Sequence, residues 1–109
     1  MELLFVYGTL KRNHRNNVLL SGYEFLGEVR TVRDYKLINC GTFPGLQYGC
    51  KAINGELYRV DDNLLERLDC LEGTKQNLYT RDYVQLEDGT QAYAYLCNMK
   101  APDYDGTNW

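Results

Sequence analysis

The stretch MELLFVYGTL, residues 1–10, decides how the rest of the chain is interpreted. Its first seven residues are almost entirely apolar, which is typical of a strand buried on both faces. Gly8 then ends the strand, and because glycine allows a sharp change of backbone direction, successive N–H groups after it can converge on one anion. We therefore predict that the turn at Gly8, Thr9 and Leu10 binds a carboxylate. The alternative is that this turn only ends the strand.

The length and charge of the chain restrict its class. Residues 1–109 fit one domain, and a hydrophobic content of 44% suffices for one core. The net charge of −3 argues against a nucleic-acid partner, because nucleic-acid-binding proteins carry a basic patch. The basic residues within 11–15, together with His14, are interpreted as a solvated loop, with a phosphate or partner contact as the alternative.

The chain is also expected to be cytoplasmic and to have no membrane partner. No apolar run approaches the roughly 18 residues of a membrane span. Because Met1 leads directly into a strand, no signal peptide is expected. The four cysteines are widely spaced beside a single histidine, which predicts reduced thiols and no metal site. A Cys40–Cys50 disulfide remains open as an alternative.

The predicted elements are mainly strands, at residues 1–7, 23–32, 35–39, 53–60, 79–87 and 90–97. Gly27 marks a possible bulge, and Asp88-Gly89 is a two-residue hairpin turn. The glycine-rich residues 40–50 are predicted to form a loop, either bordering a site or connecting a hairpin. Residues 98–109 are predicted to form a tail that packs on the body through its aromatic side chains, Tyr104 and Trp109.

One helix is clearly marked, beginning at Asp61 or Asp62 and ending before Gly73. At about 100° per residue, Glu72 falls within the apolar stripe of this helix, which is formed by Leu64, Leu65, Leu68 and Leu71. Desolvation and the helix dipole both disfavour a negative charge there, which predicts a raised pKa for the Glu72 carboxyl. A solvated glutamate at a helix end is the alternative. Together the elements indicate an α+β fold, a small mixed β-barrel with one main helix.

Six short motifs resemble the gamma-glutamylcyclotransferase-like family, and most closely its gamma-glutamylamine cyclotransferase branch. They occur in the family's order: Tyr7-Gly8-Thr9-Leu10, Phe43-Pro44-Gly45, Gly55-Glu56-Leu57-Tyr58, Val60-Asp61, Leu68-Asp69-Cys70-Leu71-Glu72 and Tyr79-Thr80-Arg81. The resemblance implies an enzyme without cofactor that acts on a small γ-glutamyl amine or γ-glutamyl amino acid. In the implied reaction the α-amine attacks its own γ-carbonyl, releasing 5-oxoproline and a free amine.

The resemblance also assigns roles to residues of this chain. It implies that Glu72 is the catalytic acid and base. The N–H groups of Gly8, Thr9 and Leu10 would bind the substrate carboxylate or stabilise the carbonyl oxygen, with hydroxyl contacts from Tyr7 and Thr9 and with Tyr79 lining the pocket. Two further charged residues are interpreted as structural: Glu56 as an anchor of the strands, and Arg81 as the partner of a buried acid.

Two other functions remain open at this point. The same anion site can serve a binding module that sequesters a small metabolite or nucleotide without chemistry. Alternatively, the exposed tyrosines or the tail can bind another protein. The loop at residues 41–49 and the connector at residues 74–78 are expected to shape the part of the site that holds the leaving amine, and neither contains a charge pattern that identifies this amine.

Overall fold

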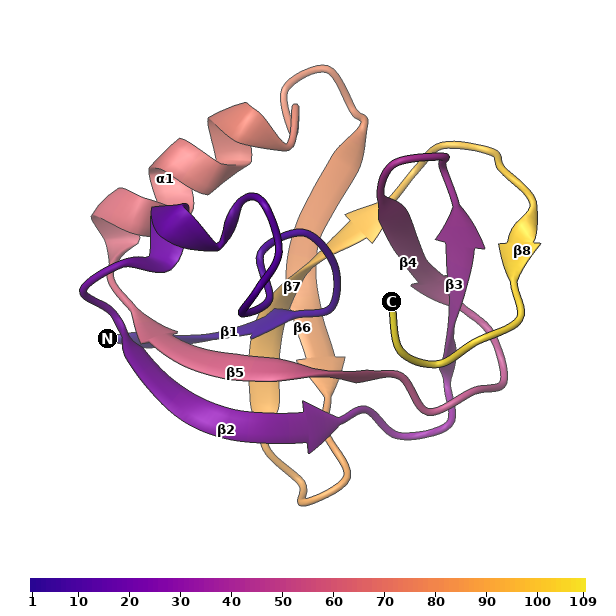
Figure 1. The fold of residues 1–109 in the computed structure, drawn as a ribbon, viewed down its shortest axis with the longest axis horizontal. Helices are drawn as coiled ribbons and strands as arrows, with labels where there is room; N and C mark the ends of the chain where they lie inside the picture. Colours follow the sequence, from indigo (N-terminus) through magenta and orange to yellow (C-terminus); the bar gives the residue numbers. More distant parts are fainter.

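The computed structural model describes every residue from 1 to 109, with strands on both sides of one α-helix in the sequence (Figure 1). No helix combines the length and the apolar character needed to cross a membrane. The helices are η1 (Asn17–Leu20) and α1 (Asp62–Leu71). The strands are β1 (Glu2–Val6), β2 (Glu24–Arg30), β3 (Tyr35–Asn39), β4 (Pro44–Tyr48), β5 (Asn54–Val60), β6 (Tyr79–Gln85), β7 (Gln91–Cys97) and β8 (Asp103–Tyr104).

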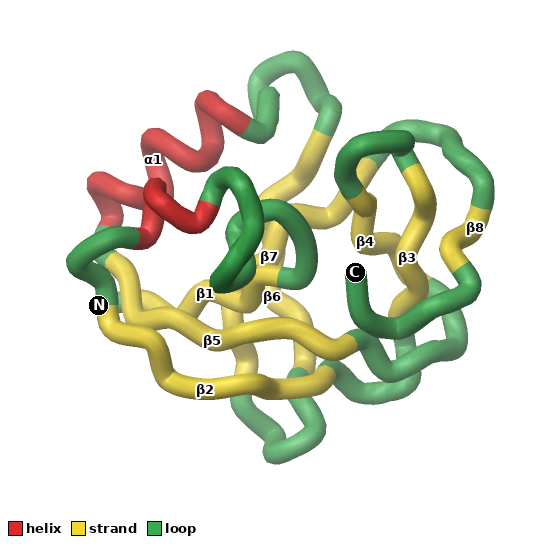
Figure 2. The backbone as a smooth tube through the Cα atoms, in the orientation of Figure 1, coloured by secondary structure: helices red, strands yellow, loops and turns green.

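Five of the strands form a ring. β5 pairs antiparallel with β2 and β1, β1 pairs parallel with β7, and β7 pairs antiparallel with β6. An isolated bridge between Thr31 and Leu86 joins the ends of β2 and β6 and closes the ring. The predicted α+β fold, a small mixed β-barrel with one main helix, is confirmed (Figure 2).

A second branch of the sheet leaves β7 through β4 and continues to β3 and β8. The prediction of a loop over residues 40–50 is therefore wrong in its middle, where β4 lies. Gly45 explains the difference, because a Cβ there would lie 2.6 Å from the Cβ of Cys97. The glycine allows β4 to approach β7 closely instead of marking a loop. The predicted tail also contains a strand, β8, and its two aromatic side chains pack on the core as expected.

β1 is buried on both faces, as predicted. Leu4 and Val6 pack into a cluster with the leucines of α1, whereas Phe5 and Tyr7 pack into a second cluster with residues of β6 and β7. The end of β1 is therefore held from two sides, and the turn that follows it has a fixed place in the fold.

The predicted ends of α1 are confirmed. The side chain of Asp61 accepts a hydrogen bond from the Leu64 N–H at 2.9 Å, which caps the N-terminus. Gly73 adopts a φ of 66° directly after the C-cap residue, and the Thr74 N–H bonds to the Asp69 carbonyl at 3.1 Å. The inclusion of Leu71 in the buried stripe is wrong, since this residue is 56% exposed. It belongs to the last turn, beyond the part of the helix that packs on the sheet.

Three predictions about turns and thiols have clear outcomes. The bulge at Gly27 is confirmed, because the register of β2 against β5 shifts between Phe25 and Gly27. The hairpin between β6 and β7 has three residues instead of two, since the Leu86 N–H bonds to the Thr90 carbonyl across residues 87–89. All four cysteines are free thiols, which removes the disulfide alternative.

Candidate active site

A cavity of about 280 Å³ lies where the C-terminal ends of β1 and α1 meet. The turn after β1 forms one side, and the start of β6 and the residues before β4 form others. All six residues that the sequence analysis assigned to the site line this cavity: Tyr7, Gly8, Thr9, Leu10, Glu72 and Tyr79. Residues far apart in the sequence are thus brought together as the motifs suggested.

The turn after β1 offers unused backbone donors to the cavity. It is fixed from within, because the Lys11 N–H donates to the Gly8 carbonyl at 3.0 Å and the Asn16 N–H donates to the Thr9 carbonyl at 2.9 Å. The N–H groups of Gly8, Thr9 and Leu10 donate no hydrogen bond within the protein. Three donors on consecutive residues beside a cavity can bind an oxygen anion.

Gly8 is required by close packing, not by an unusual backbone angle. Its φ lies outside the left-handed region that favours glycine. A Cβ at this position would lie 2.7 Å from Cγ and 2.9 Å from Cδ of Pro44, which also lines the cavity. The reason given from the sequence, freedom of the backbone to turn, is therefore replaced by the contact with β4.

Glu72 is the only acidic side chain that lines the cavity. It is the C-cap residue of α1, with φ −82° and ψ −2°, and it is half-buried. Burial raises the pKa of its carboxyl from 4.5 to about 7, which confirms the predicted direction. No salt bridge to Glu72 opposes this effect. At neutral pH the group is poised to accept and release a proton.

This raised pKa predicts how Glu72→Gln changes stability. A carboxyl whose pKa is higher in the folded state binds more protons folded than unfolded between pH 4.5 and about 7. Stability therefore falls as the pH rises through this window. Glutamine carries no such penalty, so the variant is expected to have a larger free energy of unfolding than the wild type at pH 8. Near pH 4 the difference should be small. Urea unfolding at both pH values tests this, and an equal difference at pH 4 and pH 8 contradicts it.

Two tyrosines form a rigid wall of the cavity. The Tyr7 hydroxyl donates to the Tyr95 carbonyl and accepts from the Leu46 N–H, and the Tyr79 hydroxyl donates to the Pro44 carbonyl at 3.3 Å. Burial is the main cause that raises the pKa of both phenols. Smaller contributions come from Tyr79 and Glu72 at Tyr7, and from Cys97 and Glu72 at Tyr79. Both therefore stay protonated at neutral pH. Since each hydroxyl proton is already used, the tyrosines can offer a ligand only acceptor positions or ring contacts.

An ion pair positions the end of α1. Asp69, one turn before Glu72, pairs with Arg81 of β6 at 3.0 Å and accepts a hydrogen bond from the Tyr95 hydroxyl at 2.7 Å. Both charged side chains are about a quarter exposed, at 26% and 27%. The predicted pairing of Arg81 with an acid is thus confirmed, but this acid is partly exposed and not buried. These contacts hold the end of α1 against the β6–β7 hairpin, and so they fix the position of Glu72.

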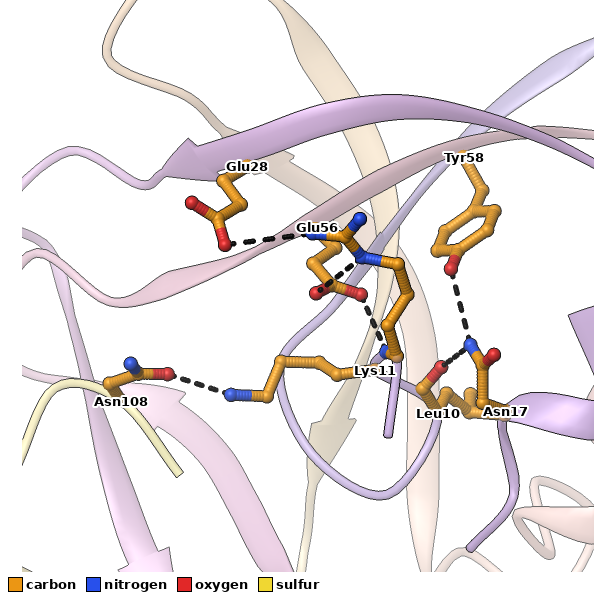
Figure 3. A network of polar contacts seen from close by, with 8 residues as sticks. Leu10, Lys11, Asn17, Glu28, Glu56, Tyr58 and Asn108 are labelled. Carbon is orange, nitrogen blue, oxygen red and sulfur yellow. Dashed lines mark hydrogen bonds and ion pairs between the residues drawn. The ribbon is translucent and has the colours of Figure 1, made fainter. Parts of the chain in front are cut away.

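A polar network supports the other side of the turn (Figure 3). Glu56 is 7% exposed and accepts hydrogen bonds from the backbone N–H of Arg12 at 2.8 Å and from its Nε at 3.5 Å. Asn17 donates to the Leu10 carbonyl at 2.8 Å. These contacts are consistent with Glu56 as a structural anchor, because its carboxylate holds the chain directly after the candidate anion site.

The solvated-loop interpretation of residues 11–15 is wrong for Lys11, which is 7% exposed. Its ammonium donates to the Asn108 side chain at 2.7 Å, and burial lowers its pKa (Figure 3). The contact joins the turn to the C-terminal residues. The sequence alone does not indicate that these two segments meet. His14 is half-buried and lines a separate polar pocket with Glu56, not the candidate active site.

Several cavity residues were missed from the sequence. Tyr95 could have been found, because alternation along β7 puts it on the same face as the buried Cys97. Leu71 and Met99 carried no local signal for a ligand site. Arg15 and Asn16 belong to the run for which a phosphate or partner contact was the alternative, and Leu78 belongs to the connector expected at the leaving-amine end. No group of three or more histidine, cysteine, aspartate or glutamate side chains is arranged to hold a metal ion.

Comparison with known proteins identifies relatives along nearly the whole chain. A Vibrio cholerae protein is 38% identical over 95 residues, which cover 87% of this chain and 81% of the relative. The gamma-glutamylcyclotransferase family protein YtfP of Escherichia coli K12 is 32% identical over 93 residues, covering 85% and 80% of the two chains.

Solved structures agree with the sequence relatives. The crystal structure of an AIG2-like protein from mouse matches with a TM-score of 0.85 and 30% identity, covering 100% of this chain and 88% of the mouse chain. The solution structure of E. coli YtfP matches with a TM-score of 0.76 and 28% identity, covering 98% and 95%. The family model described as gamma-glutamyl cyclotransferase, AIG2-like, matches residues 4–109. With this match over almost every residue, the chain belongs to the AIG2-like gamma-glutamylcyclotransferase family.

Proposed function

We propose that this protein is a γ-glutamyl cyclotransferase that converts a γ-glutamyl amine or γ-glutamyl amino acid into 5-oxoproline and a free amine. One observation carries the proposal. A half-buried carboxyl with a pKa of about 7, on Glu72, lines the same cavity as the unused N–H donors of Gly8, Thr9 and Leu10. The family to which the chain belongs supports the same reaction class.

The reaction needs one group that moves protons. The substrate binds with its α-amine neutral after losing one proton to solvent, and the amine nitrogen attacks the γ-carbonyl carbon to form a five-membered ring. Glu72 takes the second proton that the attacking nitrogen loses. As the bond between the γ-carbon and the leaving nitrogen breaks, Glu72 gives this proton to that nitrogen. The carboxylate is regenerated, and the released amine takes a further proton from water. General acid–base catalysis of this kind contributes about 10²- to 10⁴-fold.

The turn supplies the complementary charge stabilisation. As the nitrogen attacks, the γ-carbonyl oxygen gains negative charge, which N–H donors of the turn can stabilise. The α-carboxylate is the other anionic group that these donors can hold. In either arrangement the cavity bends the glutamyl group so that amine and carbonyl meet. Such orientation can remove about 7–11 kcal/mol from a barrier at best.

The test is a mass balance on the wild-type protein. It is incubated with γ-glutamyl-alanine, γ-glutamyl-leucine, ε-(γ-glutamyl)lysine, glutathione and a γ-glutamyl alkylamide, and the products are identified by mass spectrometry. The expected result is equal amounts of 5-oxoproline and free amine from at least one substrate. If the folded protein binds a γ-glutamyl compound and releases it with unchanged mass, the proposal is contradicted. This result favours the binding module, whose anion site would be the same turn.

A further inference from the structure

Several apolar side chains that line the cavity are exposed to solvent and form its mouth. Leu71 at the end of α1 is 56% exposed and Leu78 before β6 is 45% exposed, yet both line the cavity. The half-buried Phe43 and Met99 line it as well. A large apolar group bound between them would remove this surface from water, which is favourable in proportion to the area covered.

One cation is available at the same cavity. Arg15 is the only basic side chain among the lining residues, and it is exposed with no ion pair or side-chain hydrogen bond. Arg15 forms no salt bridge with Glu72, the one acidic side chain of the cavity. Its guanidinium is free to pair with a ligand carboxylate.

We propose that the leaving amine is the α-amino group of a large apolar amino acid, with its side chain against Leu71 and Leu78 and its carboxylate on Arg15. The inference rests on the proposed function and names the substrate within it. Glu72 lies beside the reacting atoms and is the only acid in the cavity, so a second ammonium on the leaving group finds no dedicated partner. A leaving group with an apolar side chain and a carboxylate matches the two leucines and Arg15, which line the cavity.

The size of the cavity agrees with a dipeptide. Its volume of about 280 Å³ lies just below the range of typical ligand sites, about 300–1,000 Å³, and so suits a small ligand. A γ-glutamyl dipeptide can fill this space and reach the mouth with its second side chain. A small leaving group such as alanine would leave the apolar rim uncovered.

The experiment compares kcat/KM for 5-oxoproline release from γ-glutamyl-leucine, γ-glutamyl-alanine, γ-glutamyl-leucinamide and ε-(γ-glutamyl)lysine. The leucine substrate is expected to exceed the alanine substrate by about tenfold, since covering half of a leucine side chain is worth about that factor. It should exceed the leucinamide substrate by about two- to fivefold, the range for one exposed ion pair, and should also exceed the lysine substrate. Leu71→Ser and Leu78→Ser are expected to lower the leucine-to-alanine ratio severalfold. Arg15→Gln is expected to bring the leucine-to-leucinamide ratio close to one.

Matched variants control for loss of surface apolar area or charge. Val18 is 71% exposed and Arg33 is exposed, and neither lines the cavity. Val18→Ser and Arg33→Gln should therefore leave both ratios as in the wild type. Equal rates with leucine and alanine, equal rates with leucine and leucinamide, or a preference for the lysine substrate overturn the inference while the cyclotransferase stands. Absence of 5-oxoproline from every substrate overturns both.

Discussion

Replacing Glu72 with glutamine is expected to lower kcat for 5-oxoproline release by about 10²- to 10⁴-fold while the protein stays folded. Glutamine has nearly the same shape but cannot take a proton from the attacking nitrogen or return one to the leaving nitrogen. The matched control is Glu66→Gln on the same helix, whose exposed side chain lies outside the cavity. Circular dichroism and single-turnover assays on both variants separate lost chemistry from lost folding.

The pH profile provides a second readout of the same carboxyl. As a base, Glu72 must be ionised, and its pKa is about 7. Because the substrate α-ammonium must also lose a proton, kcat/KM falls about tenfold per pH unit below the α-amino pKa of about 8 from this cause alone. Protonation of Glu72 should add a second fall of about tenfold per unit below pH 7, so the profile of the wild type should steepen there. Glu66→Gln should retain this limb. A Glu72→Gln protein with wild-type turnover, or a wild-type profile that does not steepen below pH 7, would remove Glu72 from the mechanism.

The local features of the site could be predicted because short segments determine them. A continuous apolar run predicted β1, and helical spacing with a glycine stop predicted α1 and the position of Glu72. A raised pKa for that carboxyl follows from its place among leucines, and burial is indeed the cause. Each of these inferences needed no knowledge of partners distant in the sequence.

The features that depend on distant contacts could not be predicted. β4 was interpreted as a loop because its glycine and proline serve contacts with β7 and with the turn at Gly8, which sequence patterns do not reveal. The buried Lys11 depends on Asn108, which is 97 positions away. Leu71 fitted the apolar spacing of the helix, but the position of the last turn relative to the sheet makes it part of the cavity mouth.

Gly8→Ala is expected to reduce kcat/KM by about 100-fold or more, the scale seen when one donor to a developing oxyanion is lost. Its Cβ would lie 2.7 Å from Pro44 Cγ. Because the end of β1 is packed on both faces, the strain can be relieved most easily by movement of the turn, which carries the unused N–H donors away from the substrate. Overpacking of this kind also costs about 1–3 kcal/mol of stability. Steady-state kinetics and urea unfolding measure the two effects.

A double-mutant cycle identifies the cause of that loss. Pro44→Ala removes the ring atoms Cγ and Cδ that the new methyl group would meet, and keeps the carbonyl that accepts from the Tyr79 hydroxyl. If the contact with Pro44 displaces the turn, Gly8→Ala should cost much less activity in the Pro44→Ala background than in the wild type, with a coupling energy of about 1 kcal/mol or more. Equal losses in both backgrounds would mean that Gly8 acts through its own backbone. In that case the anion site would depend on local flexibility of the turn, and packing against β4 would have no part in positioning its donors.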